Sequence, residues 1–169
     1  MDLELNNKNI IITGGSGGIG RGLVLEFARE GANVISASRD TKQGALLEQE
    51  AIKQRLTGKV LAVATDVTDR ASVDAMIQRC HEQFGLVDVL VNNAGGVSQP
   101  SALEELSDAD RDWEKKLNID GVVNCCQAVA KDMLSRSAGS IINISSNSSL
   151  LGEAAAGIAH YGGVKGFVN

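Results

Sequence analysis

The sequence predicts an α/β fold in which a doubly wound parallel sheet carries helices on both faces, giving three layers. Short apolar runs rich in Val and Ile alternate with longer amphipathic stretches. Nearly continuous apolar runs are typical of strands that are covered on both faces. Glycines that can end a helix in the left-handed conformation stand before the later strands, at Gly31, Gly58, Gly85 and Gly139. Repeated β-α units of this kind give parallel strands joined by right-handed crossovers.

The elements follow from these patterns in chain order. Strands are expected at residues 9–13, 33–37, 60–65, 87–92 and 140–145. Helices are expected at residues 19–30, 41–56 and 69–84, with one or two more between residues 107 and 135.

The third helix has the clearest pattern. Its apolar residues recur at helical spacing and predict one buried stripe, made of Val73, Met76, Ile77, Cys80 and Phe84. In the next helical stretch, Ser107 with Asp110 three positions later is typical of a helix N-cap. His81 is expected at the surface, and Trp113 is expected to be a packing residue.

Composition predicts one domain over residues 1–169. Hydrophobic residues make up 43% of the chain, charged residues 22%, and the net charge is −5. Because the chain is acidic and has no Lys/Arg cluster, neither nucleic acid nor an anionic membrane is an expected partner. No signal peptide or membrane-spanning run is visible, and the three cysteines lack metal-ligand spacing. We therefore expect a cytoplasmic protein with reduced thiols and no metal site.

A glycine-rich turn follows the first strand and opens the first helix. The segment from Thr13 to Gly20 reads TGGSGGIG and satisfies both G-x-G-x-x-G and T-G-x-x-x-G-x-G. Glycine permits the tight turn and lets backbone N–H groups approach a pyrophosphate at a helix N-terminus. The turn predicts a dinucleotide site that includes Gly14, Ser16, Gly17, Gly18, Ile19 and Gly20. A mononucleotide P-loop is excluded because the G-K-[ST] ending is missing.

The end of the second strand predicts which dinucleotide binds. An acidic residue there favours NAD, whereas a nearby Arg accommodates the 2′-phosphate of NADP. Ser38 stands at this position and Arg39 follows it. The interpretation is NADP, with NAD possible if Arg39 is a solvated charge and Asp40 contacts the ribose.

Six motifs in order resemble those of the classical short-chain dehydrogenase/reductase family. They are the glycine turn, Asp66-Val67, Asn92-Asn93-Ala94-Gly95, Asn118-Ile119-Asp120-Gly121, Ile144-Ser145-Ser146 and Tyr161-Gly162-Gly163-Val164-Lys165. The resemblance implies a Rossmann-like fold and a nicotinamide cofactor. It also implies that Asp66 and Val67 contact adenine, and that Asn92, Ala94 and Gly95 border the cofactor and stabilise the sheet.

Tyr161 and Lys165 can form an acid–base pair. Positions four apart share one face of a helix, so the Lys165 ammonium can lie near the phenol and lower its pKa. Tyr161 would then exchange a proton with a carbonyl or alcohol oxygen during hydride transfer. The resemblance implies that Lys165 also bonds the nicotinamide ribose, that Asn118 holds a water in a proton relay, and that a serine bonds the substrate oxygen.

The serine assignment favours Ser146, at the expected end of the fifth strand, over Ser148. Ser146 lies two residues further from Tyr161 than is common in the family, and Ser148 would restore the usual spacing. We favour Ser146 because a loop absorbs an insertion more easily than a strand does. His160, next to Tyr161, is expected to be structural or exposed, with substrate contact as the alternative.

The function predicted from the sequence is NADP-dependent reduction of ketones or oxidation of secondary alcohols. The alternatives are a dinucleotide-binding protein without turnover and a nucleotide-sugar epimerase. The epimerase spacing fits Gly14, Gly17 and Gly20, but the N-N-A-G motif argues against it. Family members continue beyond this lysine with two strands and a substrate-covering loop, so we expect a fragment that lacks its C-terminal strands. The alternatives are a truncated product and a sheet that partner chains complete. The family also implies a homodimer or homotetramer.

Overall fold

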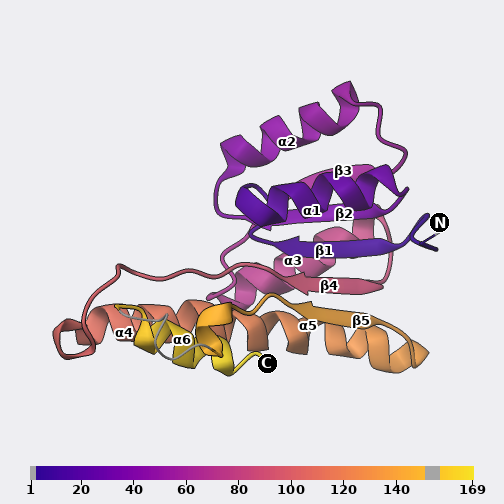
Figure 1. Ribbon diagram of the computed structural model, residues 1–169. Helices are drawn as coiled ribbons and strands as arrows, with labels where there is room; N and C mark the ends of the chain where they lie inside the picture. The colour runs from indigo at the N-terminus through magenta and orange to yellow at the C-terminus, as the bar shows by residue number, and fades with distance from the viewer. Residues whose placement is uncertain (1–2, 151–156) are drawn as a thin grey trace.

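The protein is built on one sheet of five parallel strands, seen in the computed structural model of Figure 1. The structure describes residues 3–150 and 157–169. The strands stand in the order β3-β2-β1-β4-β5. Their bounds are β1 (Asn9–Thr13), β2 (Asn33–Ser38), β3 (Lys59–Ala64), β4 (Val89–Asn92) and β5 (Ser140–Asn143). The predicted doubly wound parallel sheet is confirmed.

Strand β1 lies at the centre of the sheet and sends side chains into two separate cores. Ile10, Ile11 and Ile12 are fully buried, and successive residues of a strand point to opposite faces. Ile11 joins the cluster beneath α3 (Arg70–Gln83) and α5 (Gly121–Arg136). Ile10 and Ile12 join the cluster beneath α1 (Gly18–Arg29) and α2 (Thr41–Lys53).

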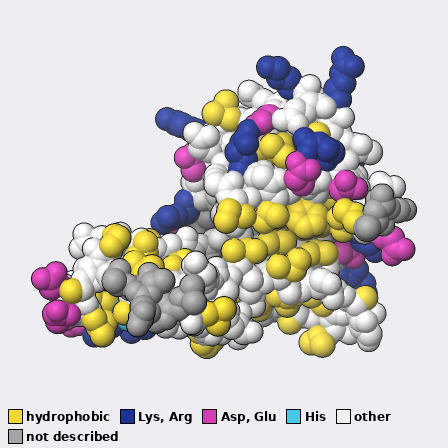
Figure 2. Space-filling model, in the orientation of Figure 1, with side chains coloured by type: hydrophobic (Ala, Val, Ile, Leu, Met, Phe, Trp, Pro, Cys, Tyr) yellow, Lys and Arg dark blue, Asp and Glu magenta, His cyan; other side chains and the backbone are white. Residues whose placement is uncertain are grey.

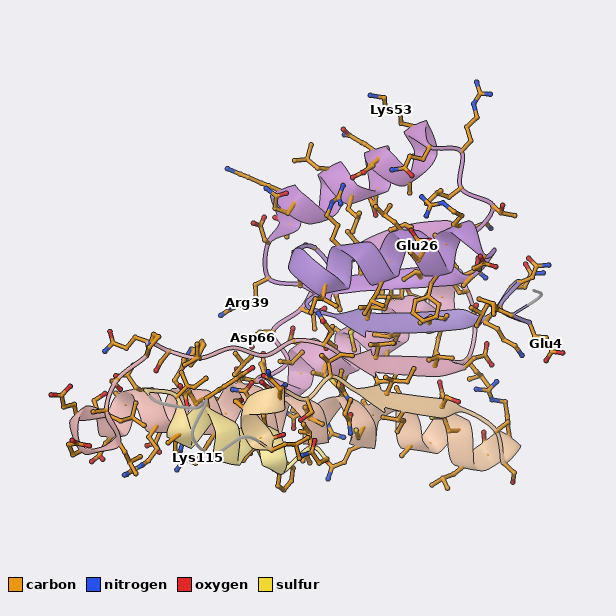
Figure 3. All side chains as sticks on the ribbon, in the orientation of Figure 1. Glu4, Glu26, Arg39, Lys53, Asp66 and Lys115 are labelled. Atoms are coloured by element: carbon orange, nitrogen blue, oxygen red, sulfur yellow. The ribbon has the colours of Figure 1, made fainter. Side chains whose placement is uncertain are left out.

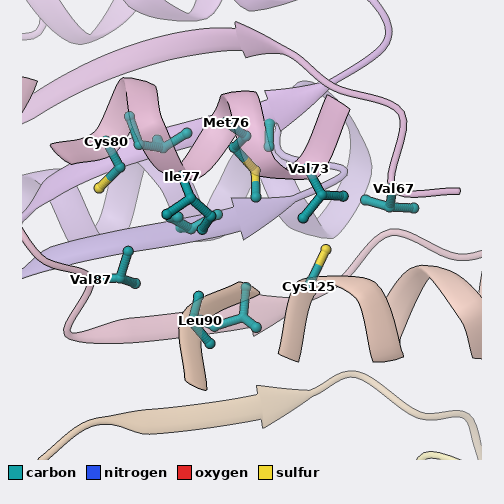
Figure 4. Close-up of a cluster of buried hydrophobic side chains, with 12 residues drawn as sticks. Val67, Val73, Met76, Ile77, Cys80, Val87, Leu90 and Cys125 are labelled. Atoms are coloured by element: carbon teal, nitrogen blue, oxygen red, sulfur yellow. The ribbon is translucent and has the colours of Figure 1, made fainter. Parts of the chain in front are cut away.

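The core on the α3 side contains the predicted helical stripe. Figure 4 shows Val73, Met76, Ile77 and Cys80 of α3 facing the sheet, where Leu90 of β4 lies. Phe84, at the end of the helix, packs against the same cluster. The stripe is confirmed because the 3.6-residue period brings these positions onto one face.

On the opposite face, α1 and α2 lie over the first three strands. Figure 2 shows a band of apolar side chains across the middle of this face, over β1 and β4 and beside α1. Strand β5 stands at one edge of the sheet, as expected, and Ile141 and Ile142 are each 43% exposed.

The stretch between residues 107 and 135 differs from a simple helix pair. Helix α4 (Asp108–Lys115) begins at the predicted cap, where the Asp110 amide donates to Ser107 Oγ at 3.1 Å. A single π-helical turn, η2 (Lys116–Asp120), then joins it to α5. Sequence periodicity could not show this turn, which changes the direction of the side chains within one helical run. Trp113 is 41% exposed and packs only in part, with its ring beside Gly96.

A histidine–carboxylate pair, His81 and Asp132, joins α3 to α5 near the N-terminal ends of the strands. His81 Nε2 lies 2.6 Å from Asp132 Oδ2, and the same oxygen accepts the backbone N–H of Val87 at 3.1 Å. The Asp132 side chain is 8% exposed and that of His81 is 37% exposed. His81 is thus at the surface, as expected, and it also links α3 to α5.

The three cysteines are free thiols that differ in burial. Cys80 and Cys125 are buried and Cys126 is half-buried, and all three are free. Burial raises the pKa of Cys80 and of Cys125 to about 12, so both stay protonated at neutral pH. Within residues 3–150 and 157–169, no helix is long and apolar enough to cross a membrane. Those same ranges hold no cluster of three or more His, Cys, Asp or Glu suited to a metal.

The strand order reverses between β1 and β4, which are paired neighbours in the sheet. Strands β2 and β3 continue from one side of β1, while β4 and β5 continue from the other. The loops after β1 and β4 therefore leave the sheet in different directions and open a crevice at the carboxyl ends of the strands. Every motif of the predicted site follows a strand end at this edge or lies on η2 or α6 (Ala159–Gly166).

Two glycines of α1 should respond oppositely to alanine. A Cβ at Gly20 would overlap the Gly14 carbonyl oxygen, whereas Gly22 has open space around it. We expect Gly20→Ala to lower the free energy of unfolding by about 1–3 kcal/mol through overpacking. Gly22→Ala should raise it by about 0.4–1 kcal/mol because it restricts the unfolded chain. Chemical denaturation of the two variants checks this, and equal effects would contradict the packing of α1 against the turn.

Candidate active site

A cavity of about 550 Å³ occupies the crevice at the carboxyl ends of the strands. It runs from the ends of β2 and β3 past the glycine turn to α6. The predicted residues that line it are Gly14, Ser16, Gly17, Ile19, Ser38, Arg39, Asp66, Val67, Ala94, Gly95, Tyr161 and Lys165. The glycine turn and the Tyr/Lys pair therefore share one cavity.

The glycine turn has the features of an anion cradle. Helix α1 begins at Gly18 after the N-cap Gly17, which supplies no side-chain cap, and its first turn holds no acidic residue. The first amide groups of a helix lack intrahelical acceptors, so uncapped ones are open to a phosphate. Gly14 has a φ of +64° and lies against Asn93 and Ala94, where a Cβ would be crowded. These features fit the pyrophosphate of a dinucleotide.

Hydrogen bonds between two loops hold the cradle in place. Thr13 Oγ1 accepts the backbone N–H groups of Asn93 and Ala94 at 3.1 and 3.0 Å. The Asn93 side chain donates to the carbonyl oxygens of Thr13 and Gly14 at 2.9 and 3.2 Å. Thr13 is 1% exposed, so this linkage is shielded from water. It joins the turn after β1 to the loop after β4.

The far end of the cavity carries the residues expected to select the dinucleotide. Figure 3 shows Arg39 and Asp66 at the ends of β2 and β3, on the same side of the sheet. Hydrogen bonds from the backbone and side chain of Thr68 hold the pKa of Asp66 below its ordinary value, and Arg39 lowers it further. Asp40 lines the cavity too, but its carboxylate accepts the Gln43 amide at 2.9 Å and caps α2.

Tyr161 and Lys165 lie on α6 but do not share the predicted electrostatic relation. Burial raises the pKa of Tyr161; a hydrogen bond with Ser146 opposes this rise, and the Glu114 carboxylate adds to it. The Lys165 ammonium donates to the Ile144 carbonyl oxygen, and burial lowers its pKa. The expectation that the pKa of Tyr161 is lowered is therefore wrong for this state, because desolvation outweighs the favourable contacts of the phenolate.

The serines after β5 surround the first half of α6. Ser146 lies close enough to Tyr161 to lower the pKa of the phenol, and Ser146 Oγ accepts the hydroxyl of Ser148 at 2.8 Å. Ser148 is 9% exposed, and its carbonyl oxygen would lie 2.7 Å from a Cβ at Gly162. Ser145 donates to the Lys165 carbonyl oxygen at 3.0 Å. Ser146 is thus the serine in contact with the phenol, while Ser148 stands behind it.

Asn118 lies in the π-helical turn and is fully buried. Its amide donates to the carbonyl oxygens of Gly96 and Glu114 at 2.8 and 2.9 Å, and its Oδ1 accepts the Gly96 N–H at 3.1 Å. A Cβ at Gly95 would lie 2.8 Å from Asn118 Oδ1 and 3.3 Å from Lys165 Nζ. The glycine therefore keeps open the space between the amide oxygen and the ammonium.

Five of the predicted site residues do not line the cavity. These are Gly18, Gly20, Asn92, Asn118 and Ser146. The Asn92 amide points along the sheet and donates to Asn143 Oδ1 at 2.9 Å, so Asn92 joins β4 to β5. Its neighbour Asn93 lines the cavity instead. The alternation of side chains along a strand explains why adjacent residues of one motif face different ways.

Sequence reasoning gave no role to six other residues of the wall, Ala37, Thr65, Asn93, Leu117, Ile144 and Ser145, although Asn93, Ile144 and Ser145 belong to the quoted motifs. Asp40, the alternative ribose contact, lines the wall as well. Most of these wall residues adjoin a predicted motif, so position at a strand end was the available signal. Leu117 does not lie at a strand end. It reaches the cavity wall because it lies in the π-helical turn.

Comparisons with known proteins agree with this geometry. The family model described as short chain dehydrogenase matches residues 8–169. The oxidoreductase UcpA of Escherichia coli (strain K12) is 40% identical over 146 residues, which cover 85% of this chain and 53% of that protein. The 3-oxoacyl-[acyl-carrier-protein] reductase FabG of Thermotoga maritima is 36% identical over 144 residues, covering 85% of this chain and 57% of that protein.

A solved structure shows the same arrangement. A short-chain type dehydrogenase/reductase from Mycobacterium marinum superposes with a TM-score of 0.90 at 30% identity, over 97% of this chain and 66% of that one. The chain spans about half the length of the curated relatives that it matches. With its parallel sheet, glycine cradle and matched sequence over residues 8–169, the chain belongs to the short chain dehydrogenase family.

Proposed function

We propose that the protein is an NADP-dependent oxidoreductase that interconverts ketones and secondary alcohols, with Tyr161 as the general acid and base. The observation that carries this proposal is the one cavity lined by both the glycine cradle and the Tyr161–Lys165 pair, with Ser146 beside the phenol just outside its wall. The bound nicotinamide would supply or accept the hydride. Family membership supports a nicotinamide dinucleotide as the cofactor class.

The chain's own groups suit the reductive direction. A phenol with a raised pKa stays protonated at neutral pH and can donate its proton to a carbonyl oxygen. The Ser146 hydroxyl, next to the phenol, would bond the same oxygen. Lys165 and Asn118 face each other across Gly95, which suits a relay that returns a proton to Tyr161.

The NADP preference rests on the charges at the adenine end of the cavity. Ser38 leaves the usual acidic position uncharged, and the Asp40 carboxylate is already engaged as a helix cap. Arg39 supplies a planar cation at the mouth, which suits a 2′-phosphate. A small-molecule substrate and assembly into a homodimer or homotetramer remain part of the proposal.

Removing the phenolic hydroxyl tests the proposed acid. We expect Tyr161→Phe to lower kcat for NADPH-dependent ketone reduction on the order of 100-fold or more, because no proton donor remains. NADPH binding, followed by fluorescence titration, should persist because the glycine cradle is unchanged. Binding without oxidation by the wild-type protein, across a panel of ketones, would favour a cofactor-binding protein without turnover.

Alanine variants of Ser146 and Ser148 distinguish the roles of the two serines. Ser146→Ala removes the hydroxyl in contact with the phenol and should lower kcat by about 100-fold, in the range seen for lost oxyanion donors. Ser148→Ala removes only a donor to Ser146 and should lower kcat less. Steady-state kinetics distinguish the two, and a larger loss for Ser148→Ala would transfer the role to Ser148.

The cofactor preference is tested at Arg39. Arg39→Ala should weaken NADPH binding by about 10-fold, or about 1.4 kcal/mol, and leave NADH binding unchanged. Lys42→Ala is the matched control, since this nearby exposed cation does not line the cavity. Isothermal titration with both cofactors makes the comparison. An equal loss for NADH, or tighter NADH binding by the wild-type protein, would reject the preference.

A further inference from the structure

Glu114 is a buried carboxylate that the proposed reaction does not use. Its side chain is 2% exposed. Oε1 accepts the backbone N–H and the hydroxyl of Ser98 at 3.1 and 3.2 Å, and Oε2 lies 2.8 Å from His160 Nδ1. Its backbone carbonyl oxygen accepts the Asn118 amide at 2.9 Å. One residue of α4 thus contacts the loop after β4, the π-helical turn and α6.

Helix α6 needs such a contact because its own sequence supports it weakly. Its eight residues, AHYGGVKG, include Gly162, Gly163 and Gly166, and its N-cap Ile158 supplies no side-chain bond. Each glycine costs a helix about 1 kcal/mol relative to alanine, and helices this short are marginal alone. The place of α6 is therefore set by tertiary contacts. At its second half these contacts are the bonds of Lys165 and Ser145.

At the first turn of α6, His160 attaches the helix to the Glu114 carboxylate of α4. The imidazole is 18% exposed and donates to the Glu114 carboxylate, which can only accept. Tyr161 follows directly in the chain. A shift of the first turn would therefore move the phenol relative to Ser146, which stands on the separate loop after β5.

We propose that Glu114 and His160 are positioning residues, which fix the first turn of α6 against the loop after β4 and thereby hold the Tyr161 phenol at Ser146. This inference rests on the proposed function for its kinetic consequence, but its geometric part does not. Among the residues that the structure describes, the Glu114 carboxylate of α4 is the charged group that acts on the phenol, and the titratable groups His160 and Lys165 lie with Tyr161 on α6.

A second consequence follows from charge. Burial is the main cause that raises the pKa of Tyr161, and the nearby Glu114 carboxylate adds to this rise. Tyr161 is the only tyrosine of the chain. The ultraviolet absorbance of its phenolate therefore reports its ionisation without interference from another tyrosine.

The experiment compares three variants of the protein. His160→Ala breaks the attachment and should lower kcat on the order of 10- to 100-fold, as expected of a misplaced catalytic group, with KM for NADPH unchanged. His160→Asn keeps a donor near the Nδ1 position and should restore most of kcat. Glu114→Gln keeps acceptors for Ser98 but removes the charge, so its phenol should ionise at lower pH than that of the wild type.

The second histidine–carboxylate pair gives a matched control. His81→Ala breaks the similar bond to Asp132 at the opposite end of the sheet. It should lower thermal stability and leave both the phenol titration and kcat unchanged. Thermal unfolding of every variant separates loss of fold from loss of position.

The outcomes separate this inference from the proposed function. A wild-type kcat in His160→Ala, equal losses in His160→Ala and His160→Asn, or an unchanged phenol titration in Glu114→Gln would each overturn the inference. If the wild-type protein oxidises no NADPH with any ketone, the proposed function fails. The phenol titration then still decides whether Glu114 acts on Tyr161.

Discussion

The linkage between Thr13 and Asn93 is the constraint on which the rest of the site depends. Strands β1 and β4 are neighbours, but their following loops turn toward opposite halves of the sheet. Four hydrogen bonds join these loops at the point where they part. They place the glycine turn against Asn93 and Ala94, so that the cavity has a fixed floor. Gly95, the next residue of the same loop, lies beside Lys165 and Asn118, which connects the glycine cradle to α6.

The sequence predicted the fold well because each strand, helix and cap has its own local sequence pattern. The buried runs of β1 and β2 and the stripe of α3 follow from side-chain periodicity, and the caps at Ser107 and the glycine turn follow from backbone chemistry. Element ends differed by up to three residues, as at α2, where helix ends fray and local signals are weak. The motifs also predicted most of the cavity wall, because parallel strands bring their carboxyl ends to one edge.

What the sequence could not predict depends on long-range placement. The π-helical turn at Lys116–Asp120 departs from the helical period, so neither the burial of Asn118 nor the role of Leu117 in the wall followed from spacing. The Glu114–His160 bond joins residues 46 positions apart, and neither residue belongs to a motif. The expected electrostatic pairing of Tyr161 with Lys165 failed for a related reason. Spacing of four gave a shared face, but the orientation of the ammonium was decided by a carbonyl from another segment.

The raised pKa of Tyr161 changes how the site should be understood. A phenol that is activated in advance would be a better base, and it would favour oxidation of an alcohol. Here burial, with a smaller contribution from the Glu114 carboxylate, raises the pKa of the phenol, and only Ser146 acts to lower it. A group that must give up a proton to a reduced carbonyl oxygen benefits from being protonated at the start. In the proposed reaction, reduction would use the protonation state that the phenol has in this site, whereas oxidation would need an added positive charge beside it.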